Sequence, residues 1–205
     1  MIPKEMINSY KESVMKFGRF VEDMFDRSVY ALVDRNADMA KEVIEDDKLA
    51  DKMRDELNEK TIIMIGEYAP VGKQLVESVN GFILENALEM IGDKSVQIAV
   101  ETLKLLKEPS LKPLVDLPKM ASTAEKMMRI SLDVYKDESN AYAIEELLKM
   151  EEYVDELNIS IEDELKLYMM ESPKNVSRAL SLMFISKHIE DIADLCLKVI
   201  PKRPL

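Results

Sequence analysis

The chain has 205 residues, of which 28 are basic and 40 are acidic, and its formal net charge is −12 at pH 7. This charge argues against a nucleic acid as partner, because a phosphate backbone attracts basic surfaces. The single cysteine, Cys196, excludes an internal disulfide and a cysteine-rich zinc site. No signal-peptide pattern is present, and no stretch approaches the roughly twenty apolar residues of a membrane helix. We therefore expect a soluble cytoplasmic protein.

The first half of the sequence has the pattern of three long helices. Glycine is scarce, whereas Ala, Leu, Met, Glu and Lys are common, which is typical of a helical protein. A first helix is predicted from about Glu5 to Arg35, and apolar steps of three and four mark its inward face at Val14, Phe17, Val21, Met24, Phe25, Ser28 and Leu32. A second helix follows Asn36 and ends near Glu67, because Pro70 cannot continue a helical ladder. A third spans roughly Lys73 to Lys107.

The pattern restarts after a segment with three prolines that ends at Pro118. Three further helices are predicted, at about Lys119–Lys136, Asn140–Met170 and Pro173–Ile200. No alternating strand pattern of useful length occurs, and the short connections favour antiparallel neighbours in a bundle. We therefore predict an all-α fold of two tandem three-helix bundles related by an internal pseudo-two-fold duplication. The predicted parts are a first repeat at 1–108, a Pro-rich linker at 109–118 and a second repeat at 119–205.

Acidic pairs recur in both halves of the chain. Four pairs, each with its two residues four apart, are Asp47 with Asp51, Glu89 with Asp93, Glu151 with Asp155, and Glu190 with Asp194. Adding 104 to the numbers of the first pair gives the third, and adding 101 to those of the second gives the fourth. Residues four apart lie on one helix face and are close enough to share a cation. A duplicated unit with such pairs suggests two similar cation sites.

One such pair alone is more often a solvated helix face than a metal site. Besides the recurrence, the placement of the acids favours a cation: they belong to stripes of similar spacing, Phe82-Glu89-Asp93-Val96-Val100 and Met183-Glu190-Asp194-Leu197. We expect these stripes to face neighbouring helices, where a charge is costly unless it is paired, protonated or bound to metal. Lys94, Lys187 or Arg54 could instead supply ion pairs. All-oxygen ligands favour magnesium, manganese, iron or zinc.

The same segments resemble a known family. Residues 88–93 (LEMIGD) resemble the LERIGD signature of the PhoU family, and residues 188–194 (HIEDIAD) resemble its second-repeat counterpart, HLERIAD. Residues 43–51 resemble the acidic second helix of that family, and residues 20–32 also fit. The signature arginine is replaced by Met90 in the first repeat and by Asp191 in the second.

This resemblance implies two three-helix bundles with metal clusters on E/DxxxD motifs. The ligands that it implies are Asp47, Asp51, Glu89, Asp93, Glu151, Asp155, Glu190 and Asp194. It further implies a non-enzymatic regulator of phosphate uptake. The partners would be the ATPase subunit of a phosphate transporter and a sensor histidine kinase, and the protein would reach the membrane only through them. We also expect a homodimer.

Other functions remain as alternatives. The chain could be a PhoU-like accessory of another permease or of a potassium-transport system, or a purely structural helical module. A di-iron carboxylate enzyme is excluded, because that site needs a Glu-x-x-His motif on each of two helices and the chain has a single histidine, His188. No Ser-His-Asp arrangement or glycine-rich phosphate loop is present, so we expect no catalytic site.

Overall fold

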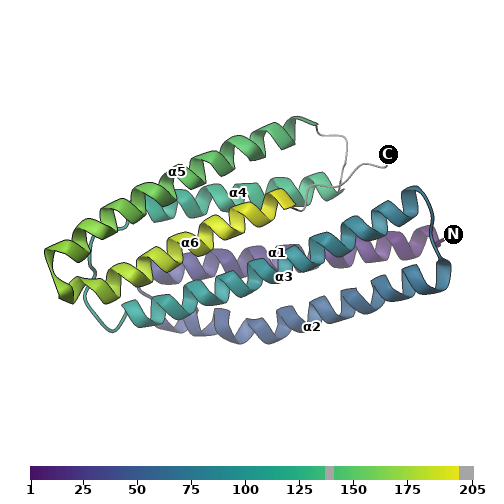
Figure 1. Cartoon of the computed structure of the whole chain (residues 1–205). Coiled ribbons are helices and arrows are strands. Elements are labelled where there is room, and N and C mark those ends of the chain that lie inside the picture. The colour runs from purple at the N-terminus through teal and green to yellow at the C-terminus, as the bar shows by residue number, and fades with distance from the viewer. Residues whose placement is uncertain (137–140, 199–205) are drawn as a thin grey trace.

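The computed structural model describes residues 1–136 and 141–198, and within these ranges the chain is helical and contains no strand. The elements are α1 (Lys4–Val33), α2 (Ala37–Tyr68), α3 (Lys73–Leu105), α4 (Asp116–Lys136), α5 (Ala141–Glu171), the short 3₁₀ helix η1 (Pro173–Asn175) and α6 (Val176–Lys198). The predicted all-α fold with three helices per repeat is confirmed (Figure 1). The expected ends of helices at Asn140 and Ile200 lie outside the described residues. In the described part of the chain, no helix combines the length and apolar character needed to span a membrane.

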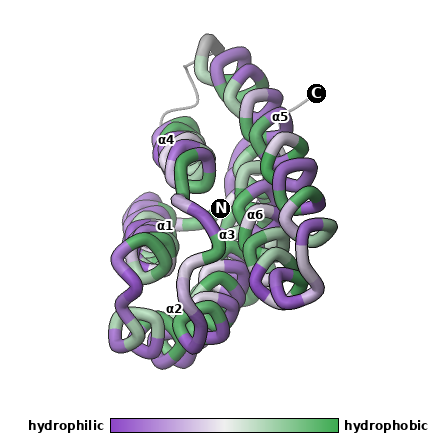
Figure 2. Tube along the Cα trace, turned by 90° about the vertical axis from the view of Figure 1, so that its left-hand side faces the viewer, coloured by the Kyte–Doolittle hydropathy of each residue, from purple (hydrophilic) through white to green (hydrophobic). Residues whose placement is uncertain are grey.

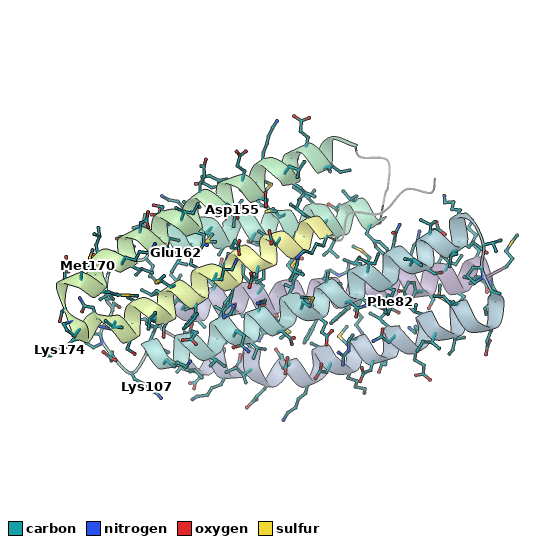
Figure 3. The ribbon with its side chains drawn as sticks, in the orientation of Figure 1. Phe82, Lys107, Asp155, Glu162, Met170 and Lys174 are labelled. Carbon is teal, nitrogen blue, oxygen red and sulfur yellow. The ribbon has the colours of Figure 1, made fainter. Side chains whose placement is uncertain are left out.

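The two repeats form two layers that meet along α3 and α6. In Figure 1 the helices α1 to α3 form the lower layer and α4 to α6 the upper one. The end view in Figure 2 places α2 and α5 at opposite ends of the cross-section, with α3 and α6 side by side between them. Lys107, just after α3, and Lys174, just before α6, lie at the same end of the molecule (Figure 3). The two central helices are therefore antiparallel.

Local sequence accounts for where the helices begin and end. The side chain of Asn36 caps α2 by accepting hydrogen bonds from two backbone N–H groups of its first turn. Helix α2 ends at a left-handed residue, Ala69, which is followed by Pro70. Helix α4 begins at Asp116, three residues before the expected start, because Pro118 lies in the first turn, where its missing N–H is no loss. In the second repeat Pro173 begins η1 rather than α6 itself.

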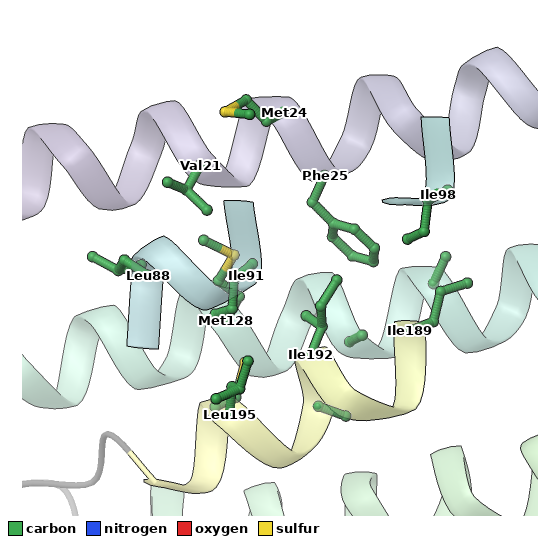
Figure 4. Close-up of a cluster of buried hydrophobic side chains, with 14 of the residues drawn as sticks. Val21, Met24, Phe25, Leu88, Ile91, Ile98, Met128, Ile189, Ile192 and Leu195 are labelled. Atoms are coloured by element: carbon green, nitrogen blue, oxygen red, sulfur yellow. The ribbon is translucent and has the colours of Figure 1, made fainter. Parts of the chain in front are cut away.

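One apolar core joins the repeats. All seven residues that the sequence placed on the inward face of α1 are buried. Met24 from α1 and Met128 from α4, which occupy equivalent positions, lie in the same buried cluster with side chains from α3 and α6 (Figure 4). Burial of each such side chain contributes about 1.5–3 kcal/mol. The duplicated apolar positions thus build a single core rather than two separate ones.

The acidic stripes are less buried than expected, although Val96, Met183 and Leu197 still pack against the core. Phe82, at the start of the first stripe, is 45% exposed, and Val96 and Val100 are only half-buried. The core face of α3 runs instead through Leu88 and Ile91, one or two positions before the acids. The residues of the equivalent stripe on α6 are likewise only half-buried. The acids of the two stripes therefore lie at the edge of the core and remain partly accessible to solvent.

Two carboxylate clusters as candidate metal centres

The four predicted ligands of the first repeat come together between α2 and α3. We call Asp47, Asp51, Glu89 and Asp93 the first cluster. Burial raises the pKa of Asp47, and the negative charges of Asp51 and Asp93 raise it further. The pKa of Asp93 is also raised, first by burial and then by Asp51. Two acidic pairs from separate helices thus repel one another across the contact between α2 and α3.

A cation from the chain itself lies in the first cluster. The guanidinium of Arg54, on α2, pairs with the carboxylate of Glu89 on α3. Its Nη2 is also 3.6 Å from a carboxylate oxygen of Asp51 and 2.9 Å from one of Asp55. Burial lowers the pKa of Arg54, but these contacts outweigh burial and raise it above its usual value. The guanidinium in turn limits the rise in the pKa of Glu89 that burial causes. Of the three ion-pair partners that the sequence offered, Arg54 is the one that bridges α2 and α3.

The second cluster consists of Glu151 and Asp155 on α5 with Glu190 and Asp194 on α6. Burial raises the pKa of Glu151, and the charges of the other three members add to the rise. Asp155, labelled in Figure 3, has a buried carboxylate oxygen, Oδ1, that accepts no hydrogen bond from any described residue. The four acids of the second repeat are therefore also brought together.

Two lysines pair with acidic residues of α6, one with Glu190 of the second cluster and both with its neighbour Asp191. Lys187 donates a hydrogen bond to Glu190 and lies 3.3 Å from Asp191, and all three residues are on α6. Lys94 does not pair with the first cluster by hydrogen bond: its Nζ donates to Oδ2 of Asp191 at 2.6 Å and so joins α3 to α6. These contacts hold the pKa of Asp191 below its usual value even though burial raises it. Asp191, which replaces the signature arginine, thus ties the two repeats together.

The chemistry of both clusters suits a hard cation, but their present geometry is not a finished metal site. Carboxylate oxygens are the ligands that such cations prefer. Within residues 1–136 and 141–198, however, no group of three or more His, Cys, Asp or Glu side chains is arranged to hold a metal ion. In the second cluster, the buried Asp155 Oδ1 is an oxygen that lacks a donor, which fits a cation ligand. In the first cluster, the positively charged guanidinium of Arg54 already lies between α2 and α3.

Sequence reasoning missed a buried polar cluster in each repeat. In the first repeat the hydroxyl of Tyr10 donates to the fully buried carboxyl of Glu85 at 3.2 Å and accepts from Thr61 at 3.0 Å. Burial raises the pKa of Glu85 to about 7. In the second repeat Ser186 Oγ donates to Oδ1 of the buried Asn158 at 2.6 Å. The one sequence signal for these clusters is that a polar residue recurs at equivalent positions, Glu85 and Ser186, which the offset of 101 relates.

Comparison with known proteins places this architecture in a family. A profile described as the PhoU domain matches residues 14–102 and 117–200, one match for each repeat. The "Phosphate-specific transport system accessory protein PhoU homolog 2" of Thermotoga maritima is 40% identical over 96% of this chain and 83% of its own length. A similarly named homolog from Aquifex aeolicus is 32% identical over 88% of this chain and 81% of its length.

The fold agrees with these matches. The crystal structure of PhoU from Pseudomonas aeruginosa superposes with a TM-score of 0.91 over 96% of this chain and 94% of that one, at 23% sequence identity. The whole six-helix arrangement is thus shared, and both repeats match the same domain profile. The chain belongs to the PhoU family.

Proposed function

We propose that this protein is a non-enzymatic, metal-binding regulator of phosphate uptake that docks as an adaptor on an ATP-driven phosphate transporter. A sensor histidine kinase is the second partner in this proposal. The observation that carries it is the extent of the match to relatives named accessory proteins of a phosphate-specific transport system. The Thermotoga maritima protein aligns with 96% of this chain, so the likeness includes both repeats. The net charge of −12 would favour a basic patch on the partner.

Direct binding tests the proposed partner. The purified ATPase subunit of the host's phosphate transporter is immobilised, and binding of the full-length protein is measured by biolayer interferometry. The matched control is the ATPase subunit of a different ATP-driven importer from the same host. We expect saturable binding to the phosphate-system subunit alone. The cytoplasmic part of the sensor kinase is tested in the same way.

Phosphate uptake provides the cellular test. Deletion of the gene should change the rate of phosphate uptake in phosphate-rich medium, and a plasmid copy should restore it. Absence of binding to the transporter subunit together with unchanged uptake would contradict the proposal. Binding to both ATPase subunits would instead favour a general permease accessory.

The carboxylate clusters supply the metal-binding part of the proposal. In the second repeat Glu151, Asp155, Glu190 and Asp194 would hold the ion, and iron, zinc, manganese and magnesium are the candidates. A bound cation supplies positive charge that offsets the mutual repulsion of these carboxylates. Since two of the ligands come from α5 and two from α6, binding would pin these helices together. In the first repeat the acids Asp47, Asp51, Glu89 and Asp93 are the corresponding ligands, but Arg54 alters that cluster.

Metal content and thermal stability test this part. The protein is purified without a chelator or a metal-affinity column, and its metals are counted by elemental analysis. Because a ligand that binds only the folded state stabilises it, metal at a hundred times its Kd should add about 2.7 kcal/mol. The double variant Glu190→Gln/Asp194→Asn should lose both the metal and this gain. A wild-type protein without metal, whose Tm does not respond to added Mn²⁺, would refute metal binding while leaving the transporter assay unaffected.

A further inference from the structure

The first cluster contains a fixed positive charge that links its two helices. The side chain of Arg54 is 24% exposed and extends from α2 to Glu89 on α3, while it also contacts Asp51 on its own helix. A metal ion shared by the acids of α2 and α3 would lie between the same carboxylates. A guanidinium there repels a divalent cation and at the same time occupies the carboxylate oxygens that would bind it.

The second repeat has no charge at the equivalent position. Adding 104 to the number of Arg54 gives Asn158, which is 8% exposed and whose Oδ1 accepts a hydrogen bond from Ser186. The asparagine therefore points its amide into a buried polar contact and brings no charge to the second cluster. The pairs of carboxylates are equivalent in the two repeats, but the residue one turn further along the helix is not.

Lys187, next to the second cluster, does not link two helices as Arg54 does. Both ion pairs of Lys187 in the described part of the chain are with residues of its own helix, Glu190 and Asp191. Its side chain is 50% exposed, so it can turn into solvent at little cost. Across the gap, on α5, the buried Oδ1 of Asp155 has no hydrogen-bond donor among the described residues. The link between α5 and α6 on this side is thus left open to a cation.

We infer that Arg54 takes the place of a metal ion in the first repeat, so that the chain binds metal through its second cluster only. In the first repeat Arg54 then joins α2 to α3 without metal, whereas in the second repeat an ion joins α5 to α6. The metal site of the second repeat rests on the function proposed above. The replacement of the ion by Arg54 rests on contacts of the first repeat alone.

Mn²⁺ titration of the chelator-treated protein tests the inference by isothermal calorimetry. Arg54→Met removes the charge and keeps most of the apolar stem, and Arg54→Gln serves as a second variant if the first does not fold. Wild type should show binding that Glu190→Gln/Asp194→Asn abolishes and that Glu89→Gln/Asp93→Asn leaves intact. Arg54→Met should gain additional binding that Glu89→Gln/Asp93→Asn removes. We expect the first-repeat affinity to rise at least about tenfold, equivalent to about 1.4 kcal/mol.

Lys187→Met is the matched control, because it removes a cation from the edge of the other cluster. It should tighten the existing binding without adding a second class of site. The thermal readout is independent of calorimetry: without metal Arg54→Met should melt below wild type, and Mn²⁺ should raise its Tm by more than it raises that of wild type.

Two results would overturn the inference: no additional Mn²⁺ binding in either Arg54 variant, or wild-type binding that both double variants reduce equally. A wild-type protein that binds no Mn²⁺ beside an Arg54→Met protein that does would support the role of Arg54. The same result would refute metal binding by the second cluster. The role of Arg54 and metal binding by the second cluster thus fail on different outcomes of the titration.

Discussion

The two repeats share a helical frame and an apolar pattern, yet they neutralise their interior polar groups by different means. The first repeat uses charge: Arg54 pairs with Glu89, and an ionisable carboxyl, Glu85, is buried with a tyrosine. The second uses neutral groups at the same two positions, where Asn158 and Ser186 bond to one another. At these two positions, an ionisable residue in the first half is matched by an amide or a hydroxyl in the second.

This difference shows which positions the duplicated fold constrains. Apolar positions meet in one shared core, so both copies must fit the same neighbours, and interiors tolerate little change in volume. Polar positions need only a partner, and any complementary pair supplies one. A buried pair is therefore free to change as a unit, and the two repeats have arrived at different pairs.

The largest expected effect comes from substitutions in the shared core, which test whether equivalent core positions of the two repeats contribute equally to stability. Met24→Ala and Met128→Ala each remove a fully buried side chain from equivalent positions. Each should lower the free energy of unfolding by about 2–5 kcal/mol, because a cavity adds to the lost burial. The two losses should agree to within about 1 kcal/mol, as measured by urea denaturation followed by circular dichroism. A large effect in one repeat and a small one in the other would break the equivalence.

The next largest effect is a pH dependence of stability that Glu85 gives to the first repeat and that the neutral pair of the second repeat lacks. The pKa of Glu85 rises from 4.5 to about 7 on folding. Between these values the folded protein holds more protons than the unfolded chain, so stability from this group falls as pH rises through the window and levels off above it. Glu85→Gln cannot ionise and should be more stable than wild type by roughly 2–3 kcal/mol at about pH 8, with little difference at about pH 4.

Ser186→Ala, at the equivalent position of the second repeat, is the control for this experiment. It should cost about 1 kcal/mol at both pH values, because it removes a neutral hydrogen bond and no titrating group. Denaturant midpoints of the three proteins across the pH range give the comparison. Parallel pH profiles for wild type and Glu85→Gln would show that Glu85 does not titrate in this window.

The smallest effect concerns one of the ion pairs between the repeats, that of Lys94 with Asp191. Lys94 and Asp191 are each about a quarter exposed and join α3 to α6, and the positions equivalent to them by the offset of 101 are the apolar Leu195 and Met90. A double-mutant cycle with Lys94→Met and Asp191→Asn should give a coupling energy of roughly 0.5–1 kcal/mol. The coupling should shrink in about 1 M salt, where charges are screened within about 3 Å. A coupling that is unaffected by salt would point to packing rather than charge.

Much of the fold could be predicted because its rules are local. The inward face of α1 follows from steps of three and four, and Asn36 and Pro70 mark the limits of α2 through capping and the missing N–H. The start of α4 was misplaced, since Pro118 is as compatible with a first helical turn as with a linker. The division into domains at 108 and 118 stays a prediction, and the shared core shows that the repeats pack as one body.

The candidate sites were predictable only in part. Spacing placed the two acids of each pair on one face of a helix, because residues four apart share a face whatever the tertiary structure. The meeting of two pairs from separate helices depends on how α2 packs on α3 and α5 on α6. From spacing we expected the stripes to face neighbouring helices, as Glu89 does through Arg54, but the spacing could not show that the acids lie beside the core rather than within it. Spacing also offered Arg54, Lys94 and Lys187 equally as partners. Their different roles depend on which helix each side chain can reach, and that follows from the packing of α3 against α6.

The antiparallel contact of α3 with α6 makes the chain resemble a homodimer whose two subunits have been joined end to end. In a true homodimer every substitution appears twice and must suit both sides of the two-fold axis. Here each side can change alone, while the linker keeps the halves at a high effective concentration. Arg54 in the first repeat corresponds to Asn158 in the second, and Glu85 corresponds to Ser186. A homodimer of identical subunits could not carry such differences between its halves. Fusion thus permits specialisation, because a substitution in one half need not recur in the other.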